Sequence, residues 1–167
     1  MELRRPSLAD KEAILDMVEE FLAQDSRTDG LWNFATGETV YEDWLEANQL
    51  QEMGLQGVPA IQFVAFDEDS LPLGFLSLRL RLNDNLLAVG GHIGYSVRPS
   101  QRGKGLAKAM LQAALAIAKS KNIKCALLTC HVDNPASRAV ILANGGKLEN
   151  VVDGVERYWI EVEGKYE

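Results

Sequence analysis

Apolar side chains three and four positions apart mark the helical parts of the chain. Ser7, with Asp10 three residues later, is a typical helix start, and the apolar positions behind it predict an amphipathic helix. Pro135 suits the first turn of another helix, because no backbone N–H is needed there. Four helices are expected, over residues 7–24, 40–51, 104–120 and 135–143.

Short apolar stretches between these helices are typical of β-strands. The stretch over residues 73–82 alternates apolar and polar positions, which predicts one buried face and one face nearer to solvent. The dipeptide Asp153-Gly154 indicates the turn of a β-hairpin. Strands are expected over residues 2–5, 61–66, 73–82, 92–97, 123–130, 148–152 and 155–162.

The order of these elements, β-α-α-β-β-β-α-β-α-β-β, predicts an α/β fold of one domain over residues 1–167. The strand over residues 92–97, the helix after it and the strand over residues 123–130 form a central βαβ unit. Its two strands should run parallel, with a right-handed crossover. The expected architecture is a mixed, mostly antiparallel sheet flanked by helices.

A polar segment that contains glycine, residues 25–39, is expected to form the loop between the first two helices. Trp32 and Phe34 are unusual in such a loop. Aromatic side chains on a long loop either fold over a functional site or hold the loop against the core, and both interpretations stay open.

The composition is that of a globular domain, with 47% apolar and 25% charged residues among 167. The formal net charge of −7 argues against nucleic acid or an anionic membrane as a partner. No apolar run reaches the roughly 18 residues that a membrane-spanning helix needs. Residues 1–6 do not resemble a secretory signal, so a cytoplasmic location is expected.

Neither a disulfide nor a metal site is expected. Cys125 and Cys130 are five positions apart in one predicted strand, so their side chains point to opposite faces. His92 and His131 are the two histidines of the sequence, and neither belongs to a short cluster of metal ligands.

A glycine-rich turn, Arg102-Gly103-Lys104-Gly105-Leu106-Ala107, leads into the long helix over residues 104–120. Its bare main chain, the helix N-terminus and two basic side chains favour an anion such as a pyrophosphate. It lacks the hydroxyl residue of a P-loop, and Lys108 stands where a dinucleotide fingerprint has its third glycine. The alternative is a turn whose glycines only let strand and helix pack closely.

This turn resembles the R/Q-x-x-G-x-G/A acyl-CoA loop of the GNAT acetyltransferase superfamily. The order of the elements is similar to that fold along essentially the whole chain. Asn134-Pro135-Ala136-Ser137 resembles the family's N-x-x-A/S at the start of the following helix, and Ile93-Gly94-Tyr95 is similar to the I-G-Y of one branch.

The resemblance implies acetyl-CoA as acyl donor, direct transfer to an amine without an acyl-enzyme, and no metal. Backbone amides of the turn would hold the CoA pyrophosphate. Main-chain groups of Tyr95, Ser96 and Val97 would bind the pantetheine arm and thioester, with an N–H near Tyr95 as oxyanion donor. Asn134 would bond the pantetheine, and Ser137 would lie close to it. The cofactor-binding residues implied are Tyr95, Ser96, Val97, Arg102, Gly103, Lys104, Gly105, Leu106, Ala107, Asn134 and Ser137.

The sequence departs from the family at the groups that move protons. No Glu lies on the strand before the turn, and Ile141 stands where many members have a Tyr acid. His92 is the first candidate for the general base, although a structural histidine is an equal interpretation. His131 is a weaker candidate, as is Tyr158. A water chain could also suffice.

The sequence therefore predicts an acetyl-CoA-dependent N-acetyltransferase. The expected acceptor is a primary amine of a small molecule, ahead of a protein N-terminus or lysine. The alternative is a non-catalytic acyl-CoA-binding or regulatory module on the same fold. Dimers are common among similar proteins, which allows a homodimer.

Overall fold

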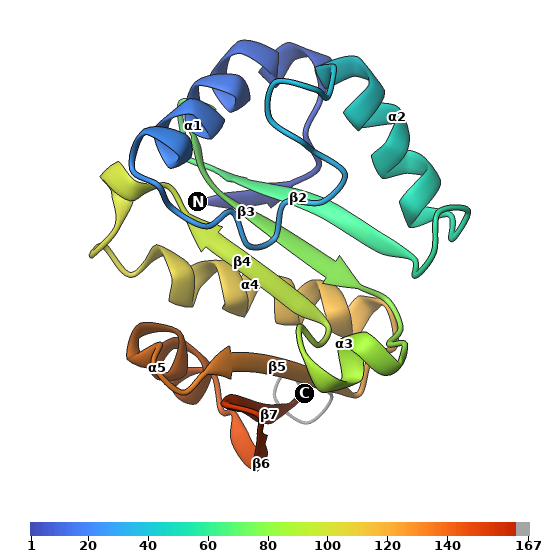
Figure 1. The fold of residues 1–167 in the computed structure, drawn as a ribbon, viewed down its shortest axis with the longest axis vertical. Helices are drawn as coiled ribbons and strands as arrows, with labels where there is room; N and C mark the ends of the chain where they lie inside the picture. Colours follow the sequence, from blue (N-terminus) through green and yellow to red (C-terminus); the bar gives the residue numbers. More distant parts are fainter. Residues whose placement is uncertain (163–167) are drawn as a thin grey trace.

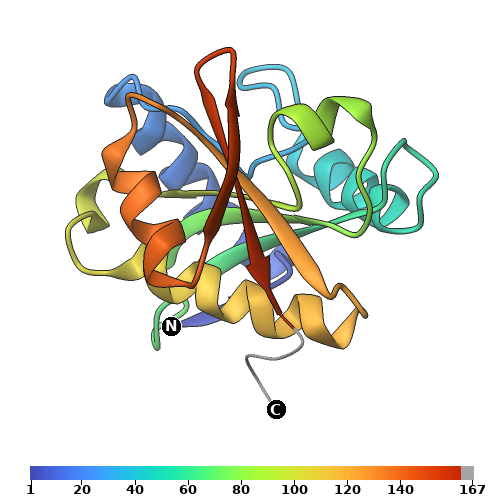
Figure 2. The same ribbon diagram turned by 90° about the horizontal axis from the view of Figure 1, so that it is seen from below.

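Two antiparallel sheets form the framework of the computed structural model, which describes residues 1–162 (Figure 1). In the four-stranded sheet the strand order is β1-β2-β3-β4, and in the three-stranded sheet it is β5-β7-β6. Figure 2 shows the three-stranded sheet nearest to the viewer, with α4 and α5 beside it. The strands are β1 (Glu2–Arg4), β2 (Ala60–Phe66), β3 (Pro72–Arg79), β4 (Ile93–Val97), β5 (Cys125–His131), β6 (Lys147–Val152) and β7 (Val155–Glu161).

Helices cover both faces of the four-stranded sheet (Figure 1). One apolar cluster joins α1 and α2 to one face, and a larger cluster joins the other face to α4, β5 and β7. The helices are α1 (Lys11–Ala23), α2 (Tyr41–Glu52), α3 (Asp84–Ala88), α4 (Leu106–Ser120) and α5 (Pro135–Ala143), with short 3-10 turns at Leu8–Asp10 and Pro99–Gln101.

The predicted fold class and order of elements are confirmed, with one added helix. Helix α3 has only five residues and buries none of them, so it leaves no apolar periodicity to detect. The Asn83 side chain caps it by accepting a hydrogen bond from the Leu86 N–H at 2.9 Å. The domain prediction extended to residue 167, and its last five residues lie outside the described part.

The expectation of a solvent-facing side on β3 is wrong, because both of its faces are buried. Ser77 and Arg79 are only 1% and 6% exposed. Alternate residues share a face, and Phe75 belongs to the cluster with α1 and α2, so Ser77 and Arg79 also point to that side. The helices cover the face that the polar residues of β3 occupy.

The two strands of the central βαβ unit run in the same direction, but they lie in separate sheets (Figure 1). They meet at one point, where the His92 N–H donates to the Leu127 carbonyl at 2.8 Å. Gly91 allows this approach, since a Cβ there would lie 2.2 Å from the Leu127 oxygen. Beyond this point no ladder joins β4 to β5, so the expected mixed sheet is split in two.

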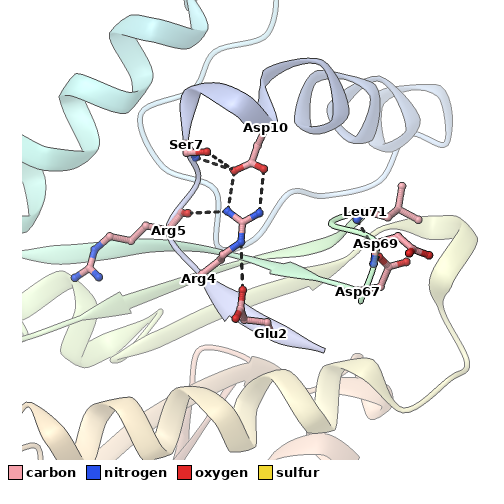
Figure 3. A network of polar contacts seen from close by, with 8 residues as sticks. All are labelled: Glu2, Arg4, Arg5, Ser7, Asp10, Asp67, Asp69 and Leu71. Atoms are coloured by element: carbon pink, nitrogen blue, oxygen red, sulfur yellow. Dashed lines mark hydrogen bonds and ion pairs between the residues drawn. The ribbon is translucent and has the colours of Figure 1, made fainter.

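A buried carboxylate ties β1 to the start of α1 (Figure 3). The Arg4 guanidinium donates to both oxygens of Asp10, at 2.9 and 3.0 Å, and lies 3.7 Å from the centre of the Phe66 ring. The Ser7 N–H and hydroxyl both donate to Asp10 at 2.9 Å. The Ser7–Asp10 signal in the sequence thus marks the helix start, and Asp10 is its acceptor.

Asp10→Asn should lower the free energy of unfolding at pH 7 by about 1–3 kcal/mol, because it removes the carboxylate that Arg4 and Ser7 share. The Arg4 hydrogen bonds hold the pKa of Asp10 below its usual value, so the carboxylate stabilises the fold above about pH 4 and this contribution is lost as the pH falls. Urea unfolding at pH 7 and pH 3 should show a smaller difference from wild type at pH 3. The exposed Glu68→Gln serves as control, and an equal difference at both pH values contradicts the assignment.

Candidate active site

A cavity of about 850 Å³ opens where β4 and β5 diverge. Most of its lining comes from the loop after α1, the edge of β4, the turn before α4, and the end of β5 with the start of α5, and Arg79, Val89, Gly90 and Val155 complete it. Residues predicted for the site from three separate parts of the sequence therefore meet in one place. All eleven predicted cofactor-binding residues except Lys104 line this cavity.

The turn into α4 presents a row of main-chain donors. Ala109 is the first residue of the helix whose N–H has an acceptor, the Gly105 carbonyl at 3.2 Å. Within residues 1–162, the amides from Gly103 to Lys108 have no hydrogen-bond acceptor. Such a row at a helix N-terminus can bind a phosphate or pyrophosphate.

Glycine is required in this turn for backbone conformation. Gly103 and Gly105 have φ angles of +79° and +75°, which residues with a Cβ rarely adopt. A Cβ at either position would meet nothing within 4 Å, so neither glycine is explained by close packing. The lack of neighbours around both glycines argues against the alternative of a turn whose glycines only let strand and helix pack closely.

The two basic side chains of the turn form hydrogen bonds with groups of the protein itself. The Arg102 guanidinium turns back and donates to the Val97 carbonyl at 3.0 Å and to the Ser26 hydroxyl at 2.6 Å. The Lys104 ammonium donates to Gln101 at 3.0 Å. Both leave a positive charge near the turn, but Arg102 also holds it against α1 and β4.

A buried ion pair that the sequence interpretation missed holds the start of the turn. Arg98 donates to Glu20 of α1 at 3.0 Å and to the Pro72 carbonyl at 3.0 Å. Glu20 also accepts from the Ser100 N–H at 2.8 Å and from its hydroxyl at 3.0 Å. Burial favours a raised pKa for Glu20, but the Ser100 and Arg98 hydrogen bonds outweigh it and lower the pKa. An arginine directly before a proline at a strand end is the one sequence signal for this anchor.

The edge of β4 supplies a second set of main-chain groups. The Arg98 N–H donates to Leu73 and the Arg79 N–H donates to His92, which places the even-numbered residues of β4 in hydrogen-bonded positions facing β3. Tyr95 and Val97 therefore turn their N–H and C=O groups away from β3, toward the cavity. By the same pattern the main chain of Ser96 pairs with β3, and its hydroxyl donates to the Asp29 carbonyl at 2.6 Å.

The start of α5 closes the far side of the cavity. The Asn134 side-chain oxygen accepts from the Ser137 N–H at 3.2 Å, so Asn134 caps the helix. The Tyr95 and Ser137 hydroxyls lie 3.1 Å apart. Burial raises the pKa of Tyr95, which keeps its hydroxyl protonated.

His92 lies at the junction of the two sheets and does not line the cavity. It is 8% exposed, and its Nδ1 accepts a hydrogen bond from the Leu127 N–H at 2.9 Å. Burial and the nearby Arg79 charge lower the pKa of His92 to about 4, so the neutral ring joins β4 to β5. This geometry favours a structural role over that of a general base.

The remaining candidates for proton transfer occupy different places. His131, at the end of β5, is exposed and lines the cavity. Tyr158 is buried in the core, donates its hydroxyl to Glu156 at 3.1 Å and is not among the lining residues. Ile141 is also in the core, 1% exposed. Of these side chains, His131 is the one placed to meet a ligand.

Loop residues 25–30 line the cavity, whereas the two aromatic residues of the loop hold it in place. The Trp32 N–H donates to the Gln62 side chain at 3.0 Å, and the Trp32 carbonyl accepts from the Trp44 indole at 2.7 Å. Phe34 packs edge-on against Trp44, with ring centres 5.6 Å apart. The aromatic residues therefore tuck the loop onto the core, and its first half faces the site.

Within the described part of the chain, no group of three His, Cys, Asp or Glu side chains could hold a metal ion. No helix among residues 1–162 is long and apolar enough to cross a membrane. Both cysteines are free; Cys130 is buried, whereas Cys125, which was also expected to be a buried thiol, is exposed.

A sequence model of the acetyltransferase (GNAT) domain matches residues 1–147, so the chain belongs to this family of acyl-CoA-dependent acetyltransferases. No curated protein matches it in sequence. Among solved structures, the ribosomal L7/L12 alpha-N-protein acetyltransferase RimL, in complex with coenzyme A, is similar with a TM-score of 0.70 and 22% identity over 98% of this chain and 94% of that one.

Two further structures resemble the chain at lower TM-scores. The acetyltransferase yncA from Salmonella typhimurium, with its cofactor acetyl-CoA, has a TM-score of 0.61 and 19% identity over 99% of this chain and 96% of that one. A chimera of the Vibrio cholerae spermidine N-acetyltransferase SpeG and hSSAT has a TM-score of 0.63 and 21% identity over 99% of both chains. The predicted family is confirmed.

The neutral form of His92 should make the fold sensitive to acid. An unfolded histidine titrates near pH 6.5. The pKa of about 4 in the fold means that His92 stabilises the protein above pH 6.5 and loses this contribution as the pH falls toward 4. His92→Asn keeps an acceptor for the Leu127 N–H, so between pH 7 and 4 it should lose about 1–2 kcal/mol less unfolding free energy than wild type. If the pH–rate profile of the wild type has a limb near pH 6–7 and the profile of His92→Asn lacks it, His92 is a base and the structural role is wrong.

Removing Glu20 should weaken coenzyme A binding without touching the ligand directly. Glu20→Ala leaves Arg98 and the Ser100 N–H without their shared acceptor, so the turn loses its anchor to α1. We expect a rise of about fivefold to tenfold in the Kd for coenzyme A, measured by calorimetry below the unfolding temperature. Glu19→Ala, the exposed neighbour, serves as control. Equal affinity in the two folded variants excludes a positioning role.

Proposed function

We propose that this protein transfers the acetyl group of acetyl-CoA directly to the primary amine of a small molecule. The observation that carries the proposal is the row of amides from Gly103 to Lys108 without acceptors, which opens into the cavity between β4 and β5. Bound acetyl-CoA would supply a reactive thioester. The residues of the chain would bind it, orient it and present the amine.

Each part of the cavity suits one part of the acyl donor. The amides of the turn would hold the pyrophosphate, with the N-terminus of α4 adding its partial positive charge. The main-chain groups of Tyr95 and Val97 would bond the pantetheine arm along the free edge of β4. The Tyr95 N–H is our candidate for the donor that stabilises the developing oxyanion. Asn134 and Ser137 would meet the arm from the α5 side.

Proton transfer is assigned to groups that reach the cavity. His131 is our candidate base, because it is exposed and lines the cavity. The Tyr95 hydroxyl, kept protonated by burial, is a donor within the same cavity. Solvent would serve the remaining transfers, since neither the Glu nor the Tyr that many family members use stands in this sequence.

A small acceptor is favoured by the way the loop after α1 is held. Ser96 binds the Asp29 carbonyl, and Gln62 binds both the Gly30 carbonyl and the Trp32 N–H, so the loop is fastened to the sheet beside the cavity. A fastened loop bounds the space for the acceptor on this side. A peptide amine is the second candidate, favoured by the TM-score of 0.70 to an enzyme that acetylates a ribosomal protein. A homodimer and a cytoplasmic location stay predictions from the sequence.

Two measurements test the proposal together: heat of coenzyme A binding, and thiol release from acetyl-CoA with a panel of primary amines and with short peptides. We expect binding, and amine-dependent release above the slow hydrolysis without amine. Faster release with peptides than with any small amine contradicts the small acceptor. Tight binding without amine-dependent release supports the non-catalytic module instead.

Gly105→Ala should raise the Kd for coenzyme A tenfold or more, because the left-handed turn that aims the amides becomes strained. Gly154→Ala is a matched control, with a φ of +77° and nothing within 4 Å of its Cβ, in the β6–β7 hairpin outside the cavity. The two changes carry the same backbone cost. Calorimetry should therefore show a loss of affinity in the first variant alone, and an equal loss in both would count against the turn as the phosphate site.

A further inference from the structure

A buried arginine forms part of the cavity wall at the end opposite the glycine-rich turn. Arg79, the last residue of β3, is 6% exposed and lines the cavity. Its guanidinium carbon lies 4.9 Å from the centre of the Trp32 ring. Gly94 of β4 has no side chain to cover it, and a Cβ there would lie only 3.0 Å from Nη2. The guanidinium therefore lies directly beside Gly94, which also lines the cavity.

The hydrogen bonds of Arg79 are incomplete. A guanidinium has five N–H donors, but Arg79 makes one hydrogen bond, from Nη1 to the Gly90 carbonyl at 3.2 Å. Its Nε is buried without an acceptor. Among residues 1–162, no carboxylate lies within ion-pair distance of it, and the nearby Asp29 pairs with Arg27 at 3.5 Å. Burial lowers the pKa of Arg79 to about 10, against the opposing charge of Asp29.

The other two buried arginines among residues 1–162 each have a carboxylate partner, which Arg79 lacks. Arg98 is paired with Glu20 and Asp16, and Arg157 with Glu149. Both also donate to backbone carbonyls. Burying a cation without an anion is costly, and such groups are normally paired. Arg79 alone among these three faces a cavity, where a ligand can supply the anion.

The phosphates of coenzyme A are too far away to be that anion. The backbone N–H of Arg79 donates to the His92 carbonyl, directly before the first residue of β4. The glycine-rich turn follows the last residue of β4. Residues 93–97 of the strand span about 13 Å at roughly 3.3 Å per residue. With the pyrophosphate in the turn, Arg79 lies toward the end of the cavity where the acyl group and the acceptor must meet.

We propose that Arg79 binds an oxyanion on the acceptor, so that the substrate is an amine that also carries a carboxylate or a phosphate. This inference rests on the proposed acetyltransferase function. A carboxylate or phosphate would accept hydrogen bonds from the unused N–H donors of the Arg79 Nη atoms. A polyamine would instead bring positive charge toward a buried cation. The fixed charge also favours the neutral amine, the form that attacks a thioester.

Matched acceptors test this inference. β-Alanine is compared with β-alaninamide, O-phosphoethanolamine with ethanolamine, and spermidine is added as a polyamine. The readout is kcat/KM from thiol release. We expect the anionic member of at least one pair to exceed its neutral partner tenfold or more, and the two pairs distinguish carboxylate from phosphate. Arg79→Gln should bring that ratio below about threefold, and Arg79→Lys should leave an intermediate ratio.

Arg81→Gln is the control, because Arg81 is an exposed arginine two residues beyond and lies outside the cavity. Calorimetry of coenzyme A binding verifies that each variant is folded; if Arg79→Gln is not, the ratio is read from Arg79→Lys. A wild-type preference for the neutral amines or spermidine, or an unchanged ratio in the Arg79 variant, overturns this inference and leaves the acetyltransferase assignment standing. Binding of coenzyme A without acetylation of any amine counts against the proposed function itself.

Discussion

Two hydrogen bonds at one point join the two sheets of this protein. The His92 N–H donates to the Leu127 carbonyl, and the Leu127 N–H donates back to the His92 ring. Beyond this point β4 and β5 separate, so each keeps an edge with unpaired main-chain groups. The cavity, the free amides of Tyr95 and Val97, and the approach to the glycine-rich turn all follow from that separation. Because the ring nitrogen must accept a hydrogen bond, the junction depends on an uncharged His92.

The turn before α4 is held by side chains that leave its amides free. Glu20 binds Arg98 and Ser100 just ahead of it, and Arg102 reaches back to Val97 and Ser26. These contacts use the charged side chains of Glu20, Arg98 and Arg102 and none of the amides from Gly103 to Lys108. In the proposed function, a diphosphate would meet donors already in place, which would lower the entropy lost on binding.

The two buried arginines next to β4 differ in their partners. Arg98 is paired with carboxylates and holds the start of the turn. Arg79 contacts the Trp32 ring, donates to one backbone carbonyl and lines the cavity. Burying an arginine without an anionic partner destabilises the fold unless a ligand completes the pairing. Together with burial, the Arg79 charge lowers the pKa of His92, so this arginine and the sheet junction are electrostatically linked.

The sequence by itself determined every strand and α-helix except α3, and it located the glycine-rich turn, because these features are local. Apolar periodicity located α1, α4 and α5, and glycines at positions 103 and 105 marked a backbone that only glycine adopts readily. Tertiary structure alone decided the roles of isolated polar residues. His92 and Arg79 have no local pattern that distinguishes a junction from a base, or a buried cation from a solvent-facing one. Their roles depend on which distant segments cover them: β5 for His92, and the loop after α1 for Arg79. The packing of distant segments decides whether these side chains are buried, and burial lowers the pKa of both.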